Sequence, residues 1–487
     1  MKLSKIFKNA PDIEITGLYT DSRKVKKGGM FFCLDGLVTN GHKFISMAIA
    51  NGASCIVHSE SITDYNDDVI YVKVEDVNAV LNQVVSKFYD FPSEKMLVFG
   101  VTGTNGKSTV TNIINDIYNH FSSCGYIGTI AITYNEKKLE PDLTTPDAIY
   151  LHQILHDMVK EKVKAVALEV SSHGLEQGRV DAIDFDVAIF TNFTYDHLDF
   201  HGTMENYFNA KTKLFKEMKN DGVSILNVDD PKFNDLYSVC NTRVVTYGIE
   251  KEATYRANNI KLGVTSTCFT LIYQEKEYEV TTNLVAMYNI YNLLAAIAGI
   301  VESGIPIEQV LPYVSNIKQV EGRVEMIDEG QPFQIIVDFA HTPDGLEKIY
   351  EFAKEITPEG SEIISVFGSA GKRDKAKRKV FGEISDKYCD LIILTEDDPR
   401  DENSKDIADE IKKGIQNTRS IFIEDRYDAI RTAIESANVS DTVLILGKGD
   451  EVFMYHEEGR VPWIGDHNAA KEVVHKYYLG EDDSEKN

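Results

Sequence analysis

A glycine-rich segment, Val101-Thr-Gly-Thr-Asn-Gly-Lys-Ser-Thr-Val110, combines residue types that bind phosphate groups. It follows the apolar run 96–99 and opens a helical pattern at Val110. In a strand–turn–helix unit of this kind, glycines expose backbone N–H groups to an anion, and the helix dipole favours negative charge. Lys107 would reach the β- and γ-phosphates of a nucleotide, and Ser108 would hold Mg²⁺ through its hydroxyl. The segment therefore predicts that ATP binds here with Mg²⁺.

The spacing of this segment departs from the usual G-x-x-x-x-G-K-[ST] pattern. Val101 stands five residues before Gly106, and Gly100 comes one step early. The alternative is a glycine turn between a strand and a helix, with an incidental lysine. The flanking strand and helix patterns favour the nucleotide site.

Two further apolar segments, 165–168 and 186–190, predict strands that end in polar residues. Glu169 follows the first, and Asp196-His-Leu-Asp-Phe-His201 comes shortly after the second. Ligands in parallel α/β sheets bind outside the carboxyl ends of the strands, so these residues are candidates for holding Mg²⁺, which prefers oxygen ligands. Glu169 could instead be an acid at a helix N-terminus. The Asp/His cluster could instead bind zinc, but it begins a loop and does not place histidines at i and i+4 on a helix.

Two other motifs have simpler interpretations when each is taken alone. Asp21-Ser-Arg23 is typical of a turn or a helix cap. Segment 207–215 predicts a helix that carries lysines, among them Lys211, and such a pattern indicates a solvated face.

The composition is that of an ordinary soluble protein, with 43% hydrophobic and 26% charged residues. The net charge of −26 argues against nucleic acid as a partner, because neutralising phosphates needs clustered Lys and Arg. The six cysteines are scattered without a C-x-x-C pair, which favours reduced thiols in the cytoplasm over disulfides or a zinc site. The first residues lack the apolar core of a signal peptide, and no apolar run approaches roughly 18 residues, so we expect no membrane span.

Strand-like and helix-like segments alternate along the chain, which predicts an α/β fold with mostly parallel sheets. Its length of 487 residues suits about three domains. Breaks are expected near 90–95 and near 328–332, and the charged tail 480–487 is expected to be disordered. The predicted domains span residues 1–95, 96–330 and 331–487.

Several ordered motifs, spread over about residues 1–475, resemble successive signatures of the Mur ligases. They are Thr102–Thr109, Leu168–Leu175, Asp196–Gly202, Ala210-Lys211, Asn289–Asn292, Glu321-Gly-Arg323 and Asp338–Pro343. Within that family the chain is similar to the MurE type, which adds the third residue to the peptidoglycan stem peptide. The resemblance implies a small UDP-binding N-terminal α/β domain, a central P-loop ATPase domain and a C-terminal Rossmann-like domain.

The activity implied by the resemblance is ATP-dependent amide ligation on UDP-N-acetylmuramoyl-L-alanyl-D-glutamate. In such enzymes the γ-phosphoryl group passes to the substrate carboxylate, and the amine of the incoming amino acid attacks the acyl phosphate. ATP is closed between the middle and last domains. The partners implied are therefore small-molecule substrates, with ATP and Mg²⁺ as cofactors and a monomer as the working form.

The resemblance also assigns functions to single positions. The ATP-site positions are Thr102, Gly103, Thr104, Asn105, Gly106, Lys107, Ser108, Asn289, Asn292, Arg323 and Asp338. The catalytic and metal positions are Lys107, Ser108, Glu169, His197 and Lys211. At Lys211 the family carboxylates its lysine to a carbamate, which would reverse the expectation of a solvated side chain.

The positions that match the UDP-substrate site are Ser22, Thr144, Thr145, Ser171, Gln177 and Arg179. Arg179 has the charge and fork geometry that suit a carboxylate or phosphate. Leu143 stands where the family often has Asn, and Ala286 stands where a glycine commonly precedes the nucleotide-side motif.

The amino-acid pocket implied by the resemblance comprises Arg373, Asp397, Asp398, Arg400, Gly447 and Glu451. MurE enzymes that use meso-diaminopimelate usually read Asp-Asn-Pro-Arg here, and those that use lysine commonly read Asp-Asp/Asn-Pro-Ala/Asn. Arg400 would bind the distal carboxylate of diaminopimelate, a group that lysine lacks. Asp398 adds a negative charge that suits an ammonium group. The sequence favours meso-diaminopimelate and leaves L-lysine as the alternative.

Two interpretations from other classes remain. A P-loop kinase or GTPase would use the same phosphate cradle, but its Asp-x-x-Gly or Asn-Lys-x-Asp elements are not evident. A non-catalytic nucleotide-binding module is the other, and the presence of Lys107, Glu169, His197 and Lys211 speaks against it.

Overall fold

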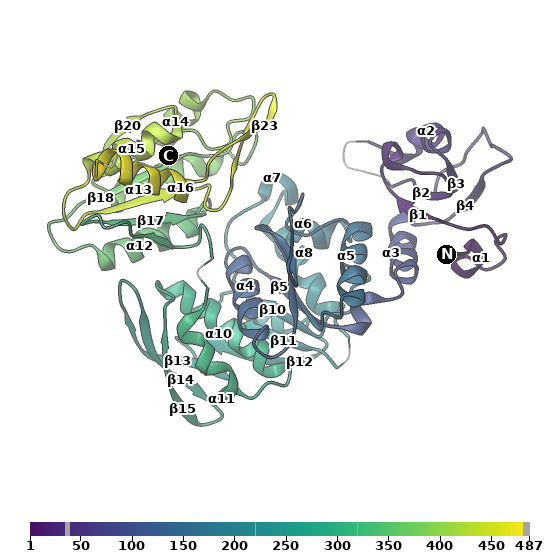
Figure 1. Ribbon diagram of the computed structural model, residues 1–487, viewed down its shortest axis with the longest axis horizontal. Coiled ribbons are helices and arrows are strands. Elements are labelled where there is room, and N and C mark those ends of the chain that lie inside the picture. Colours follow the sequence, from purple (N-terminus) through teal and green to yellow (C-terminus); the bar gives the residue numbers. More distant parts are fainter. Residues whose placement is uncertain (35–38, 220, 319, 481–487) are drawn as a thin grey trace, which may run out of the picture.

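The computed structural model describes residues 1–34, 39–219, 221–318 and 320–480, and within them the strands form three larger sheets and one two-stranded hairpin. Figure 1 shows three units, with the central one lying between the N-terminal and C-terminal ones. The predicted α/β fold with mostly parallel sheets is confirmed. The tail predicted to be disordered falls, from residue 481 on, outside the described residues. No helix in the described part of the chain is long and apolar enough to cross a bilayer.

The N-terminal sheet is parallel throughout, in the order β1-β2-β3-β4. All four residues of β2 are buried, as expected for a parallel strand covered on both faces. Asp21 accepts a hydrogen bond from the Arg23 backbone N–H, so Asp-Ser-Arg does cap a helical turn. The elements are α1 Leu3–Ile6, β1 Gly17–Tyr19, η1 Ser22–Lys24, β2 Gly29–Phe32, η2 Gly41–Phe44, α2 Ile45–Ala50, β3 Ala53–His58, β4 Ile70–Lys73 and α3 Val77–Phe88.

The central sheet has the order β15-β14-β13-β12-β11-β10-β5-β9-β6-β7-β8. Its middle, from β13 to β6, is parallel, and antiparallel strands extend it at both edges. Its strands are β5 Leu97–Thr102, β6 Cys124–Ile127, β7 Ile132–Tyr134, β8 Lys137–Leu139, β9 Ala165–Glu169, β10 Val187–Phe190, β11 Val223–Asn227, β12 Arg243–Gly248, β13 Tyr255–Leu262, β14 Thr267–Tyr273 and β15 Lys276–Thr282.

Helices cover this sheet, and α3 of the N-terminal unit packs against α5. The helix predicted from Val110 starts at Lys107 as α4, and it packs against α10. The helices are η3 Pro92–Lys95, α4 Lys107–Tyr118, α5 Ala148–Lys160, α6 Ser172–Glu176, α7 Leu198–His201, α8 Met204–Lys216, α9 Phe233–Tyr237, α10 Met287–Glu302, α11 Ile307–Val310 and η4 Leu311–Asn316.

The three strands that carry the predicted site end at one edge of the central sheet. Thr102 of β5 pairs in register with Phe190 of β10, and Val101 pairs with Glu169 of β9. The loops that follow these strands therefore open on the same side of the sheet, where ligands of parallel α/β sheets bind.

The C-terminal sheet has the order β16-β17-β21-β18-β19-β20 and is parallel except for the β16–β17 pair. β16 precedes the break expected near 328–332, yet it belongs to this sheet, which therefore begins at Glu325. The elements are β16 Glu325–Ile327, β17 Gln334–Asp338, α12 Pro343–Ile356, β18 Ile363–Phe367, α13 Ala376–Tyr388, β19 Leu391–Leu394, α14 Ser404–Lys412, β20 Arg419–Phe422, α15 Arg426–Ser436, β21 Thr442–Leu446, β22 Phe453–His456, β23 Gly459–Pro462, α16 Asp466–Val473 and η5 Val474–Tyr478.

A buried ion pair joins α15 to α16 in the C-terminal unit. Arg426 donates from Nε and Nη2 to the two carboxylate oxygens of Asp466, each at 2.7 Å, and neither side chain is exposed. Arg426 also donates to the Leu446 carbonyl at the end of β21. Since a bidentate pair needs both partners in place, it fixes the two helices relative to the strand end.

We predict that Arg426→Met lowers the free energy of unfolding of this unit by about 3–5 kcal/mol, because it leaves the Asp466 carboxylate buried without its cation. Arg426→Met with Asp466→Asn should recover part of that loss. Trp463 is the only tryptophan of the chain, and its Nε1 donates to Asp466 at 3.2 Å, so its fluorescence during urea unfolding reports on this unit. Equal destabilisation of the single and double variants would contradict the prediction.

Candidate functional site: a cavity between the central and C-terminal units

The glycine-rich loop lies between β5 and α4, and close neighbours restrict what can stand in it. Gly106 has a φ of +87°, and a Cβ on it would lie 2.4 Å from the Asn292 side-chain oxygen of α10. A Cβ on Gly103 would lie 1.8 Å from the Thr191 hydroxyl oxygen after β10. The loop is therefore held between the end of β10 and the start of α10, so its backbone N–H groups have fixed positions. Gly100, the early glycine of the pattern, lies within β5 and not in the loop.

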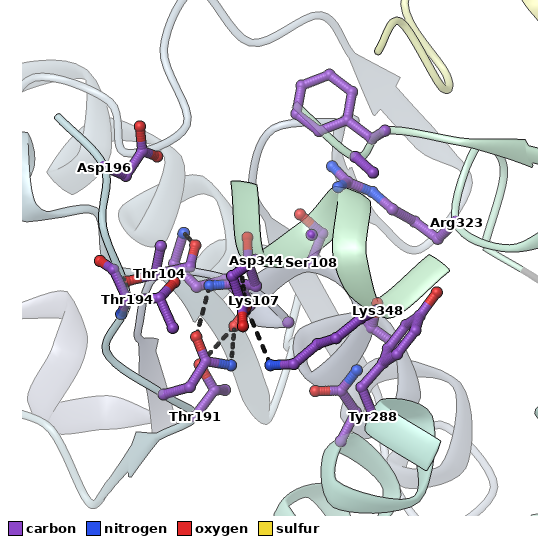
Figure 2. A pocket seen from close by; sticks show the side chains of 18 of the residues that line it. Thr104, Lys107, Ser108, Thr191, Thr194, Asp196, Tyr288, Arg323, Asp344 and Lys348 are labelled. Atoms are coloured by element: carbon purple, nitrogen blue, oxygen red, sulfur yellow. Dashed lines mark hydrogen bonds and ion pairs between the residues drawn. The ribbon is translucent and has the colours of Figure 1, made fainter. Parts of the chain in front are cut away.

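Lys107 folds back over the loop (Figure 2), where its Nζ donates to the carbonyls of Gly103 at 3.1 Å and Thr104 at 2.8 Å. Burial lowers the pKa of Lys107, and the Glu169 carboxylate opposes that shift. Asn105 donates from Nδ2 to the Asp344 carboxylate of α12 at 3.0 Å, which links the loop to the C-terminal unit. An ammonium held only by carbonyl oxygens is placed to bind an anion.

Glu169 is fully buried at the end of β9, and donors surround its carboxylate. The Ser108 hydroxyl donates to Oε2 at 2.9 Å, and the Tyr126 hydroxyl donates to Oε1 at 2.6 Å. Thr129 donates from its backbone N–H at 3.1 Å. The structure thus brings together Ser108 and Glu169, and α6 is capped by Ser171 rather than by Glu169.

Lys211 is buried, and the prediction of a solvated lysine face at this position was wrong. Its side chain is 1% exposed, and its Nζ donates to the Gly103 carbonyl at 2.7 Å and lies 4.6 Å from the centre of the Tyr207 ring. Burial and the nearby Lys107 ammonium lower the pKa of Lys211 well below its usual value. Tyr207, Lys211 and Leu214 recur at helical spacing on the buried face of α8, so the apolar pattern itself places Lys211 inside.

His197 directly precedes α7 and has a left-handed conformation, with a φ of +54°. Its Nε2 lies 3.3 Å from the Asp196 carboxylate, and burial lowers the pKa of His197 to about 3. The imidazole is therefore neutral at pH 7, and its ring nitrogen can bind a metal ion.

The other members of the Asp/His cluster point elsewhere. Asp199 lies 3.6 Å from the Arg373 guanidinium, and His201 shares a hydrogen bond with the Ser172 hydroxyl at 3.0 Å. Within the described residues, no three His, Cys, Asp or Glu side chains gather as a metal-binding group. The cluster does not have the arrangement of ligands that zinc requires.

Most residues of the predicted UDP-substrate set form one hydrogen-bonded group. Thr145 donates to the Glu169 carbonyl at 2.8 Å and lies 3.1 Å from the Ser171 hydroxyl. Arg179 donates to the Thr145 carbonyl and to the Gln177 side chain. Thr144 accepts from Thr129, next to Glu169. Ser22 is separate, because it is buried in the N-terminal unit with its hydroxyl on the Met47 sulfur at 3.2 Å.

The predicted nucleotide-side residues of the later motifs flank the loop. Asn292 donates to Asn289 at 3.0 Å on α10. Asp338, at the end of β17, accepts from the backbone N–H groups of Val324 and Ala340, and burial raises its pKa. Arg323 stacks on Phe339, with its guanidinium carbon 4.2 Å from the ring centre.

The predicted amino-acid residues divide into two groups. Arg373 and Glu451 line the cavity described below, whereas Asp397, Asp398, Arg400 and Gly447 do not. Asp398 accepts from the Lys448 ammonium at 2.7 Å and from the Tyr455 backbone N–H at 3.0 Å. Arg400 donates to the Gly371 carbonyl, and no carboxylate of the described residues lies within ion-pair distance of it.

One cavity of about 980 Å³ connects most of these positions, and Figure 2 shows side chains of both units pointing into a pocket. The predicted residues that line it are Thr104, Asn105, Gly106, Lys107, Ser108, Thr144, Glu169, Ser171, Arg179, His197, Lys211, Asn289, Asn292, Arg323, Asp338, Arg373 and Glu451. The predicted residues that do not are Ser22, Thr102, Gly103, Thr145, Gln177, Asp397, Asp398, Arg400 and Gly447.

Several residues at this site were not predicted from the sequence. Tyr126 lies in β6 and Thr129 just after it. Because β6 pairs with β9, knowledge of the strand order would have placed both residues near Glu169. Asp344 and Lys348 form an i,i+4 ion pair at 3.0 Å at the start of α12, and both line the cavity (Figure 2). Lys448 directly follows Gly447, which the resemblance did indicate.

The chain is similar in sequence to known proteins along most of its length. Residues 14–89 match the catalytic domain of the Mur ligase family, 101–300 the Mur ligase middle domain, and 322–449 the Mur ligase glutamate ligase domain. A protein of Fusobacterium nucleatum is 39% identical over 96% of this chain and 95% of its own, and is named UDP-N-acetylmuramoyl-L-alanyl-D-glutamate–2,6-diaminopimelate ligase. A relative from Alkaliphilus metalliredigens, 40% identical over 93% of each chain, has the same name.

A solved structure shares the whole fold. It is the structure of a UDP-N-acetylmuramoyl-L-alanyl-D-glutamate–2,6-diaminopimelate ligase, and it covers 98% of this chain and 99% of its own. The TM-score is 0.70 and the sequence identity 28%.

We predict that Gly106→Ala weakens nucleotide binding at least tenfold, since the new methyl group would displace Asn292 and strain a residue whose φ is +87°. Gly360→Ala is a matched control, because Gly360 has a φ of +89° and open space around its Cβ position. The measurement is the affinity for a non-hydrolysable ATP analogue by calorimetry. Equal affinity in the Gly106→Ala and Gly360→Ala variants would contradict the close approach of Asn292.

Proposed function

The chain belongs to the Mur ligase family, and we propose that it joins meso-diaminopimelate to UDP-N-acetylmuramoyl-L-alanyl-D-glutamate with hydrolysis of ATP to ADP and phosphate, in peptidoglycan synthesis. The observation that supports this most is the single cavity between two units. Lys107 of the phosphate-binding loop, Arg179 of the predicted substrate group and Glu451 of the C-terminal unit all line it. Three substrates of different chemistry would therefore meet in one enclosed space.

In the proposed reaction a carboxylate oxygen of the UDP-linked substrate attacks the γ-phosphorus of ATP, and ADP leaves. The amine of the amino acid then attacks the carbonyl carbon of the acyl phosphate, loses a proton, and expels phosphate with the former carboxylate oxygen. Lys107 is placed to stabilise the charge on the migrating phosphoryl group. Arg179 would hold the substrate carboxylate or diphosphate by its guanidinium.

We assign Ser108, Glu169, His197 and Lys211 to Mg²⁺, which would screen the phosphates when bound. The donor set fits this ion. Glu169 accepts hydrogen bonds from hydroxyl and N–H groups only, so no cation of the described residues is paired with its carboxylate in the cavity wall. His197 is neutral and can accept a metal ion.

Lys211 would serve this set as a carbamate. A neutral amine attacks CO₂, a nitrogen–carbon bond forms, and a proton is released, so the buried cation becomes an anion. The lowered pKa of Lys211 supports the proposal, because it leaves the amine unprotonated nearer to neutral pH. The carbamate nitrogen keeps one N–H that can still donate to the Gly103 carbonyl, and the loop would gain a negative neighbour that suits a metal ion.

We predict that Lys211→Ala reduces ligation about 10²–10³-fold, the cost of losing one positioned charge in a water-poor site. Acetate should restore part of the activity, since it supplies an anion in the space left by the side chain, whereas methylammonium should not. The measurement is product formation by mass spectrometry. Rescue by methylammonium alone would mean that Lys211 acts as a cation, and full turnover without any additive would refute the metal assignment.

We also propose that each domain binds a different substrate. Residues 1–95, with Ser22, would bind the UDP end of the substrate, residues 96–330 would bind ATP, and residues 331–487 would bind the amino acid. The enzyme would work as a monomer in the cytoplasm, where ATP and UDP-linked precursors are available.

The choice of amino acid follows from two contacts in the C-terminal unit. Asp398 is 7% exposed, and its carboxylate is paired with the Lys448 ammonium, so it does not call for a substrate ammonium. Arg400 has no carboxylate partner within the described residues and can bind one from a ligand. Both contacts support meso-diaminopimelate over L-lysine.

We predict phosphate release from ATP in the presence of Mg²⁺, UDP-N-acetylmuramoyl-L-alanyl-D-glutamate and meso-diaminopimelate, with a product mass that includes both substrates. L-lysine, tested in a separate reaction, should give kcat/KM at least tenfold lower. Turnover with lysine alone would overturn the assignment of the amino acid. No turnover with either would overturn the ligase proposal for this pair of substrates.

A further inference from the structure

Lys448 lies between Gly447 and Glu451 of the predicted amino-acid pocket, and its side chain has no exposed surface. Its Nζ donates to Asp398 at 2.7 Å and to Glu451, and Asp397 adds to the negative field around it. A buried ammonium is stable only with such partners. The positions of Lys448, Asp398 and Glu451 therefore depend on one another. Asp398 and Lys448 lie 50 residues apart in the chain, and their contact connects the loop after β19 to the loop after β21.

The loop that carries Arg400 depends on this contact. Asp398 and Arg400 have φ values of +47° and +55°, in the left-handed region that side chains other than glycine rarely adopt. Surrounding bonds must therefore hold them. Tyr455 of β22 provides two, because its N–H donates to Asp398 at 3.0 Å and its carbonyl accepts from the Arg400 N–H at 2.7 Å. Lys448 provides a third bond, the charged hydrogen bond to Asp398.

The charge balance of the pocket depends on Lys448 as well. Glu451 is the member of this group that lines the cavity, and Lys448 lies directly behind it. Without the ammonium, Asp398 and Glu451 would both present negative charge near Arg400. A distal carboxylate would then be repelled and a distal ammonium attracted.

We propose that Lys448 is a positioning and specificity-determining residue. It neutralises Asp398, holds Glu451 in the cavity wall and fixes the loop of Arg400, so that the pocket selects an amino acid whose far end carries a carboxylate. Lys448 acts through these neighbours and does not itself contact substrate. The inference rests on the proposed function, since it concerns the amino acid of the same reaction.

The test is a set of variants at two positions, each assayed with meso-diaminopimelate and with L-lysine. Lys448→Met should raise the KM for diaminopimelate at least tenfold and lower the preference for diaminopimelate over lysine by a similar factor, with the KM values for ATP and the UDP-linked substrate unchanged. Asp398→Asn removes the charge that Lys448 neutralises, so the double variant should regain most of the preference. Lys405→Met, which breaks an exposed ion pair with Asp409 in the same unit, is the control and should change nothing.

Asp398→Asn alone keeps the test decisive even if Lys448→Met does not fold. It should retain the KM for diaminopimelate within about threefold, because the amide oxygen can still accept from Lys448 and Tyr455 and the Asp398 carboxylate does not contact the substrate. A tenfold loss in Asp398→Asn would make Asp398 a substrate ligand and overturn the inference, as would an unchanged preference in folded Lys448→Met. A wild-type enzyme that fails with diaminopimelate would instead refute the proposed function, so the two failures are distinguishable.

Discussion

Burial of charged groups at the carboxyl edge of the central sheet is the constraint on which this structure depends. A site for polyphosphate needs cations and a metal-binding carboxylate. Each of these groups must be buried without an opposite charge from the protein paired to it. Glu169 meets that need through donors from Ser108, Tyr126 and Thr129. Lys107 meets it through carbonyl oxygens of the glycine-rich loop. Because these partners are dipoles rather than opposite charges, the charges stay available for a ligand.

In the C-terminal unit the buried charges are paired with opposite charges instead of dipoles. Arg426 and Asp466 satisfy each other completely, and Lys448 is bound by two carboxylates, so these groups stabilise the fold and shape the pocket instead of meeting substrate. Arg400 is the exception, since its guanidinium contacts a carbonyl and no described carboxylate. The cavity thus combines a phosphate side built from dipoles with an amino-acid side supported by ion pairs, and Asn105 joins the two through Asp344.

Much of this arrangement could be predicted from the sequence, because local patterns determine it. The glycine-rich loop, the strand ahead of Glu169 and the parallel sheet followed from apolar runs and their polar ends. The solvated face expected for Lys211 was wrong because the expectation followed the lysine charges and not the apolar spacing of α8, which already placed that residue inside. The bond between Asp398 and Lys448 could not be predicted, because two loops 50 residues apart meet only in the folded sheet. The same holds for Tyr126, whose role depends on strand order.

The most direct measurement follows the oxygen atoms of the reaction. UDP-N-acetylmuramoyl-L-alanyl-D-glutamate labelled with ¹⁸O in its reacting carboxylate would be turned over with ATP and meso-diaminopimelate, and the released phosphate analysed by mass. An acyl phosphate requires that one labelled oxygen leave with each phosphate while the other stays in the amide. Phosphate without label would mean that water attacks ATP directly, and the account of this cavity as a ligase site would be wrong.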